Sequence, residues 1–193
     1  PAPLAVVDLD ALEANARDLL ARAQGTPIRV ASKSVRVRAL LDHVLAMPGF
    51  AGVMGYSLAE ALWLVEQGTC TDVLLGYPSV DRAALLRLAG DARARERITL
   101  MVDDVAQVAL IERALTRAGS PDGPPVRVCL DVDAGLRLGP LHIGPRRSPV
   151  RDPDDAAALA RACERTGRIE VRGVMFYEGQ VAGLGEAGAR GPL

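Results

Sequence analysis

The sequence predicts an α/β protein built as a parallel (β/α) barrel, and three observations point to that fold class. Short apolar runs alternate with capped amphipathic segments six times along the 193 residues, as in βα units around a parallel sheet. Most of the runs are continuously apolar, as expected of strands covered on both faces. The first run is followed by no glycine-rich phosphate turn, so a doubly wound sheet is the weaker alternative.

The elements are expected in this order. Residues 10–24 predict an opening helix, with Asp10 and Glu13 in capping-box spacing and Gly25 at its end. Strands are predicted at 28–33, 52–54, 72–75, 98–102, 126–132 and 171–176. Helices between them are predicted at 35–46, at 58–67 behind a Ser57–Glu60 capping box, from Ser79, from 103 or 104 to before Gly119, and from Asp152-Pro153 to Gly167.

Six βα units are two fewer than a closed (β/α)8 barrel contains. No seventh strand is expected in residues 188–193. Residues 1–193 are therefore interpreted as one partial barrel that lacks its last strands.

Composition excludes several classes of function. The net charge of −1 gives no basic surface for nucleic acid, and no apolar run reaches the roughly twenty residues that span a bilayer. No charged segment followed by an apolar stretch opens the sequence, so a cytoplasmic protein is expected. Three scattered cysteines and two histidines form no ligand spacing, so no metal is expected.

Lys33 is the strongest candidate for a reactive group. It is the single lysine beside 22 arginines, and it is predicted as the last residue of the first strand. In a parallel barrel, reactive groups collect at the carboxyl ends of the strands. A primary amine condenses with an aldehyde and a guanidinium does not, so Lys33 is interpreted either as an aldehyde-capturing lysine or as a solvated surface lysine.

The stretch 131–152 is predicted as a long loop without secondary structure of its own, and such loops are more often functional than not. It follows the fifth strand, so Arg137 is expected at the carboxyl edge, where it could bind a phenolate or carboxylate. Arg146, Arg147 and Arg151 are interpreted as solvated loop residues.

Aromatic residues follow three of the strands. Tyr177, with Glu178 after it, ends the sixth strand, where its ring could pack against a planar cofactor or simply close the barrel mouth. Tyr56 and Tyr77 follow the second and third strands and leave the same two alternatives open. Asp131, on a buried strand, is interpreted as a hydrogen-bonding group rather than half of a metal pair with Asp133.

Four segments resemble the fold-type III pyridoxal-phosphate enzymes, the group of alanine racemase and D-threonine aldolase. They are the opening 3–12 (Pro-Leu-Ala-Val-Val-Asp-Leu-Asp-Ala-Leu), 28–34 (Ile-Arg-Val-Ala-Ser-Lys-Ser), 131–139 (Asp-Val-Asp-Ala-Gly-Leu-Arg-Leu-Gly) and 173–179 (Gly-Val-Met-Phe-Tyr-Glu-Gly). Their order and spacing cover nearly the whole chain. Within the group, the chain is most similar to bacterial proteins described as amino-acid deaminase/aldolase or alanine-racemase-like.

The resemblance implies a (β/α)8 barrel of the alanine racemase N-terminal type, followed by a β-rich C-terminal domain in a homodimer. It implies pyridoxal 5'-phosphate held by Lys33 as an aldimine, with Arg137 at its phenolic oxygen. The phosphate-binding turns and the second base would lie on parts that the 193 residues do not contain. The implied reaction is aldol cleavage, deamination or racemisation of a small amino acid, with the D configuration favoured. The alternatives are a non-catalytic pyridoxal-phosphate homeostasis barrel, or a barrel for another phosphorylated ligand.

Overall fold

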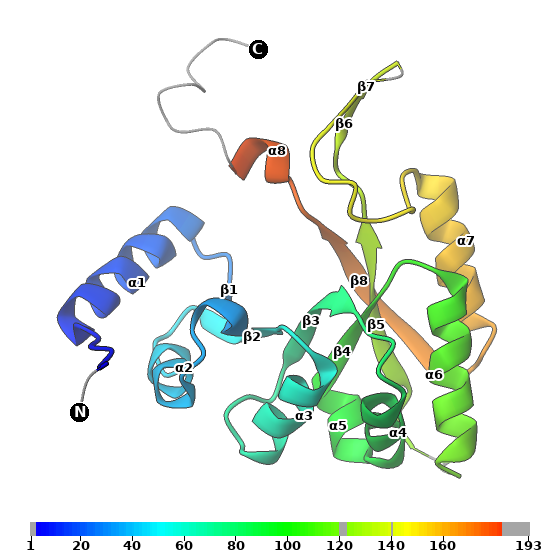
Figure 1. The fold of residues 1–193 in the computed structure, drawn as a ribbon, viewed down its shortest axis with the longest axis horizontal. Helices are drawn as coiled ribbons and strands as arrows, with labels where there is room; N and C mark the ends of the chain where they lie inside the picture. The colour runs from blue at the N-terminus through cyan, green and yellow to red at the C-terminus, as the bar shows by residue number, and fades with distance from the viewer. Residues whose placement is uncertain (1–2, 120–122, 140, 183–193) are drawn as a thin grey trace.

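A six-stranded parallel sheet forms the centre of the computed structural model, which describes residues 3–119, 123–139 and 141–182 (Figure 1). Its strands lie in the order β1 (Ile28–Ala31), β2 (Phe50–Gly55), β3 (Val73–Pro78), β4 (Ile98–Val102), β5 (Val126–Val132) and β8 (Ile169–Phe176). Each strand is added on the same edge, whereas a doubly wound sheet reverses direction at a switch point. The sheet is therefore a segment of barrel wall, as the sequence predicts.

Helices connect consecutive strands and cover one face of this wall (Figure 1). They are α2 (Arg38–Leu45), α3 (Leu58–Glu66), α4 (Arg82–Gly90), α5 (Ala92–Arg97), α6 (Val105–Arg117) and α7 (Pro153–Glu164). Neighbours in this layer touch one another, α3 with α4, α4 with α6, and α6 with α7. The opening helix α1 (Leu9–Ala23) lies beyond β1, and the short α8 (Gly179–Ala182) follows β8.

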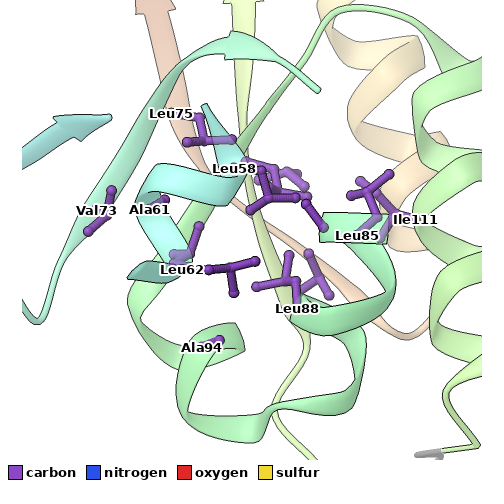
Figure 2. Packing of buried hydrophobic residues seen from close by; sticks show 14 of the residues in the cluster. Leu58, Ala61, Leu62, Val73, Leu75, Leu85, Leu88, Ala94 and Ile111 are labelled. Atoms are coloured by element: carbon purple, nitrogen blue, oxygen red, sulfur yellow. The ribbon is translucent and has the colours of Figure 1, made fainter. Parts of the chain in front are cut away.

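The hydrophobic core lies between the sheet and the helices (Figure 2). Val73 and Leu75 of β3 are fully buried against Leu58 and Leu88 of the helix layer. Burial of each such side chain stabilises the fold by about 1.5–3 kcal/mol. On the neighbouring strands β4 and β5, the opposite face of the sheet is also buried, at Thr99, Met101, Cys129 and Asp131. Burial on both faces explains why the strands read as continuous apolar runs.

Several helix starts differ from the sequence-based expectation. Asp8, not Asp10, caps α1 by accepting from the amide of Ala11. Asp81, not Ser79, caps α4, because its carboxylate accepts from two first-turn amides. Ser57 caps α3 as predicted, accepting from the amide of Glu60 at 3.2 Å. In each case the side chain that reaches the first-turn amides sets the helix start.

Two segments contain structure that the sequence reading missed. A short helix, α5, precedes β4 and is capped by Asp91. The stretch predicted as an unstructured loop contains an antiparallel hairpin, β6 (Leu136–Leu138) with β7 (Leu141–Ile143), so that prediction is wrong. Three-residue strands are too short to show a period in the sequence. The expectation about residues 188–193 lies outside the described residues.

The helix after the first strand also begins later than expected, at Arg38 rather than at residue 35. A 3₁₀ turn, η1 (Ser32–Ser34), lies between β1 and this helix, closed by a bond from the Val35 amide to the Ser32 carbonyl at 3.1 Å. In the part of the chain that the structure describes, no helix is long and apolar enough to cross a membrane.

A candidate active site at the carboxyl ends of the strands

A cavity of about 250 Å³ opens where β1, β2, β3 and β8 end. Known ligand sites hold roughly 300–1,000 Å³, so this cavity suits a small ligand or part of a larger one. It is lined by Ala31, Lys33, Met54, Gly55, Tyr56, Gly76, Tyr77, Arg147, Met175, Phe176 and Tyr177. Three of the four site residues predicted from the sequence, Lys33, Tyr56 and Tyr177, thus share one cavity. Arg137 is not in this lining set.

Lys33 lies in the η1 turn, two residues after β1, rather than on the strand itself as expected. Its neighbour Ser32 is completely buried, and the Ser32 hydroxyl donates to the Glu60 carboxylate at 2.9 Å. The side chain of Lys33 itself is exposed at the cavity. The turn therefore fixes the backbone through Ser32 and leaves the amine accessible.

Glu60 joins this turn to the end of β2. The same carboxylate oxygen that accepts from Ser32 also accepts from the amide of Tyr56, at 2.8 Å. In a regular capping box, Glu60 would accept from the backbone amide of Ser57; here it accepts from the amide of Tyr56 instead. One first-turn residue of α3 consequently holds both backbone segments that carry Lys33 and Tyr56.

Tyr77, at the end of β3, contacts the amine of Lys33 directly. The Nζ of Lys33 lies 3.0 Å from the Tyr77 hydroxyl oxygen. The ring of Tyr77 packs edge-on against Tyr56, with centroids 5.8 Å apart and planes at 79°. The hydrogen bond from Lys33 lowers the pKa of Tyr77 below its ordinary value, burial opposes this shift, and the charges of Lys33 and Arg147 add to it.

Arg147 is the arginine of this cavity, contrary to its interpretation as a solvated loop residue. Its Nε donates to both oxygens of Asp131, at 2.9 and 3.2 Å, and its Nη2 donates to the Gly76 carbonyl. The side chain of Asp131 is 1% exposed and that of Arg147 is 17% exposed. Burial raises the pKa of Asp131, and the bond and charge of Arg147 partly offset that shift.

The guanidinium of Arg147 also faces two aromatic rings. Its Cζ lies 4.8 Å from the centroid of Tyr77 and 5.7 Å from that of Tyr177. The next residue, Ser148, is buried and donates to the backbone carbonyl of Asp131 at 2.7 Å. This backbone anchor holds Arg147 over the cavity, where it is within the range of favourable cation–π contacts.

Arg137 lies on β6, is exposed, and has His142 as its strand partner. The base of that hairpin is held by Asp133, which accepts from the Gly135 amide and pairs with His142, each at 3.0 Å. Any side chain at Gly135 would collide with the His142 ring. The two hydrogen bonds keep the pKa of Asp133 below its ordinary value although burial acts to raise it.

The cysteines and the metal-binding residue types add no second reactive group to the described part of this site. The three cysteines are free and buried, and burial raises the pKa of Cys129 to about 11, so its thiol is not ionised at neutral pH. Among the residues with described positions, no three His, Cys, Asp or Glu side chains are placed to hold a metal ion. Asp131 and Asp133 are occupied by Arg147 and His142 respectively.

Sequence reasoning underrated two of these residues, Tyr77 and Arg147. Tyr77 obeys the rule that selected Tyr177, since both follow a strand at the carboxyl edge. The sequence around Arg147 does not indicate its position in the cavity, because that position depends on Asp131, 16 residues earlier in the chain.

Comparison with known proteins identifies relatives of the chain. The 3-hydroxy-D-aspartate aldolase of Paracoccus denitrificans is 28% identical over 195 residues, covering 98% of this chain and 46% of the relative. The crystal structure of D-threonine aldolase from Filomicrobium marinum is 27% identical with a TM-score of 0.70, covering 88% of this chain and 42% of that protein. The chain therefore spans less than half the length of these relatives.

More distant structures share the fold. Alanine racemase from Corynebacterium glutamicum matches with a TM-score of 0.55 at 23% identity, over 88% of this chain and 44% of that protein. The alanine racemases and D-threonine aldolases depend on pyridoxal phosphate, the cofactor that the sequence resemblance implies. The family model "alanine racemase, N-terminal domain" matches residues 7–188. The chain belongs to the alanine racemase N-terminal domain family.

Proposed function

We propose that this chain is the pyridoxal-phosphate-binding part of an enzyme that converts a small amino acid, with Lys33 as the amine that binds the cofactor aldehyde. The observation that carries the proposal is the position of Lys33. The only primary side-chain amine of the sequence lies in a cavity at the carboxyl ends of the strands, beside Arg147 and three tyrosine rings.

The residues present fit the cofactor chemically. Pyridoxal phosphate is a flat aromatic aldehyde that carries negative charge. The cavity offers an accessible amine, a guanidinium held by Asp131, and tyrosine rings that can pack against a planar ring. Two glycines, Gly55 and Gly76, leave the cavity wall without side chains at the ends of β2 and β3.

Each residue has a defined task in this proposal. Lys33 supplies the nucleophilic nitrogen and afterwards holds or releases protons at Nζ. Arg147 neutralises negative charge of the bound molecule, and Tyr56 and Tyr177 orient it by contact. When bound, pyridoxal phosphate supplies the electron sink for bond cleavage at the amino-acid Cα. The predicted role of Arg137 at the phenolic oxygen stays a prediction.

The whole protein is proposed to act on a small D-amino acid. The relatives include a D-threonine aldolase and a 3-hydroxy-D-aspartate aldolase, and these activities favour aldol cleavage over racemisation or deamination. The proposal includes a following β-rich domain, a homodimer and a cytoplasmic location, all carried over from the sequence-based expectation.

Borohydride trapping tests the proposal. The full-length protein is incubated with pyridoxal phosphate and reduced, and the modified residue is located by peptide mass spectrometry. We expect one reduced adduct on the peptide that contains Lys33, and its loss in Lys33→Ala.

A folded full-length protein that carries no adduct at Lys33 would contradict the proposal. An adduct at Lys33 without exchange of the Cα hydrogen of D-amino acids in deuterated water would instead favour the non-catalytic homeostasis barrel.

A further inference from the structure

We propose that Tyr77 is a second catalytic group of this site, whose phenolic oxygen exchanges a proton with Nζ of Lys33. The inference rests on the proposed function of Lys33 and adds a proton acceptor and donor to it. It follows from the contact between the two side chains, which lie on separate elements and are each held in place by other residues.

The geometry is that of direct proton exchange. Nζ and the hydroxyl oxygen are 3.0 Å apart, within the range of about 2.6–3.2 Å that proton transfer requires. The backbone of Lys33 is fixed through Ser32 and Glu60, and the ring of Tyr77 packs against Tyr56. Neither side chain has to move for the proton to pass between them.

The surrounding groups make the Tyr77 hydroxyl easier to deprotonate. Lys33 faces it from the η1 turn, and Arg147 faces its ring from the segment before α7. From β2, Tyr56 contributes an uncharged ring, and the carboxylate of Asp131 on β5 is engaged by Arg147. The hydrogen bond from Lys33 lowers the pKa of Tyr77, burial acts in the opposite direction, and the charges of Lys33 and Arg147 add to the lowering.

The proton step balances without any further reactant. The N–H bond of the Lys33 ammonium breaks, an O–H bond forms on the Tyr77 phenolate, and the result is a neutral amine beside a neutral phenol. The freed nitrogen lone pair can then attack a carbonyl carbon. In reverse, the phenol returns the proton to the amine, so Tyr77 serves as base and then as acid.

The other two tyrosines of the cavity differ from Tyr77 in this respect. Tyr56 lies under the guanidinium of Arg36, 5.4 Å from its ring centroid, and Tyr177 lies near Arg147. Of the tyrosine hydroxyls at this cavity, only that of Tyr77 is hydrogen-bonded to Nζ of Lys33 in the described part of the chain. Tyr56→Phe therefore provides a matched control, because it removes a neighbouring hydroxyl from the same cavity.

The first test measures the rate at which Lys33 of the full-length protein captures pyridoxal phosphate, by absorbance and by peptide mapping after reduction. We expect Tyr77→Phe to slow capture at least about 10-fold, since general acid–base groups contribute factors of that size or more. Its pH–rate profile should also lose the limb that reports Tyr77. In Tyr56→Phe the pH–rate profile should keep that limb. A capture rate and a pH profile in folded Tyr77→Phe equal to those of the wild type would overturn the inference.

The second test needs no cofactor. In protein labelled with ¹³C at the tyrosine Cζ, the resonance of Tyr77 is assigned by its loss in Tyr77→Phe and titrated with pH. We expect a midpoint below 10.0 in the wild type and an upward shift in Lys33→Met, because the amine that lowers it is gone. No upward shift would overturn proton sharing. Absence of capture by the wild type, with the shift present, would overturn only the proposed function.

Discussion

Two of the arginines in the segment between β5 and α7, Arg137 and Arg147, have opposite surroundings. Arg137, on the first half, lies in the β6–β7 hairpin and is exposed. Arg147, on the second half, is 17% exposed and donates to the buried carboxylate of Asp131. Both follow the same strand at the same edge of the sheet. The difference shows that a buried acceptor, rather than position in a loop, brings an arginine into a site.

The two halves also differ in what they are anchored to. The hairpin is tied to its own base by Asp133 and His142, and it extends beyond the end of β5 (Figure 1). The second half is tied back to the sheet, through Ser148 to the Asp131 carbonyl and through Val150 to the Asp133 amide. The same stretch of sequence therefore forms a projecting hairpin and a cover for the cavity.

The largest effect is expected from removing the buried acceptor. Asp131→Asn leaves the guanidinium of Arg147 without its carboxylate, and breaking a buried pair costs about 3 kcal/mol. Urea denaturation should show that loss in the free energy of unfolding. The double variant Asp131→Asn/Arg147→Met should recover part of it, because no unpaired charge remains. Equal stability of Asp131→Asn and wild type would mean that the pair does not hold the cover in place.

The next effect compares the two arginines directly. Arg147→Met should weaken the binding of pyridoxal phosphate by the full-length protein about 10-fold, the size of one lost charge-assisted contact. Arg137→Met should change the dissociation constant by less than about twofold, because it lies outside the lining of the cavity. Fluorescence titration measures both. The reverse order would restore Arg137 to the role that the sequence motif implies.

The smallest expected effect is a difference between Asp131 and Asp133 in how their contributions to stability depend on pH. The pKa of Asp133 is lowered, so its contribution to stability is present above the ordinary carboxyl pKa and is lost as the pH falls through its folded-state value. The pKa of Asp131 is raised, so its contribution is present at acid pH and is lost as the pH rises through its folded-state value.

Unfolding free energies measured from neutral to acid pH distinguish the two. Relative to wild type, Asp133→Asn should lose less stability on acidification, and Asp131→Asn should lose more. Parallel curves for the two variants would show that the stability contributions of these carboxylates do not change in opposite directions with pH.

The fold was predictable from the sequence because its signals are local. Continuous apolar strands such as 98–102 and 126–132 were predicted at their observed bounds, and their order followed from the barrel interpretation. Helix starts were less secure, since Asp8 and Asp10 are equally good caps by type and only the backbone decides between them.

The candidate site was predictable where a residue follows a strand, as for Lys33, Tyr56 and Tyr177. It was not predictable where the side chain depends on a distant partner. The side chain of Arg147 is positioned by hydrogen bonds to Asp131 and Gly76, and that of Glu60 by a hydrogen bond from Ser32. These contacts span 16, 71 and 28 residues of sequence. The three-residue strands β6 and β7 gave too short a pattern to read, so the hairpin around Arg137 was missed.

The sequential strand order has a consequence for ligand energetics. Within the described sheet, β1 and β8 are the outermost strands, yet both contribute to the cavity, through Ala31 and Lys33 on one side and through Met175, Phe176 and Tyr177 on the other. A molecule held between them is a non-covalent cross-link between the two ends of the wall. Its binding free energy and the stability of the curled sheet are thus linked quantities, so saturating the cavity raises the unfolding temperature of the whole wall.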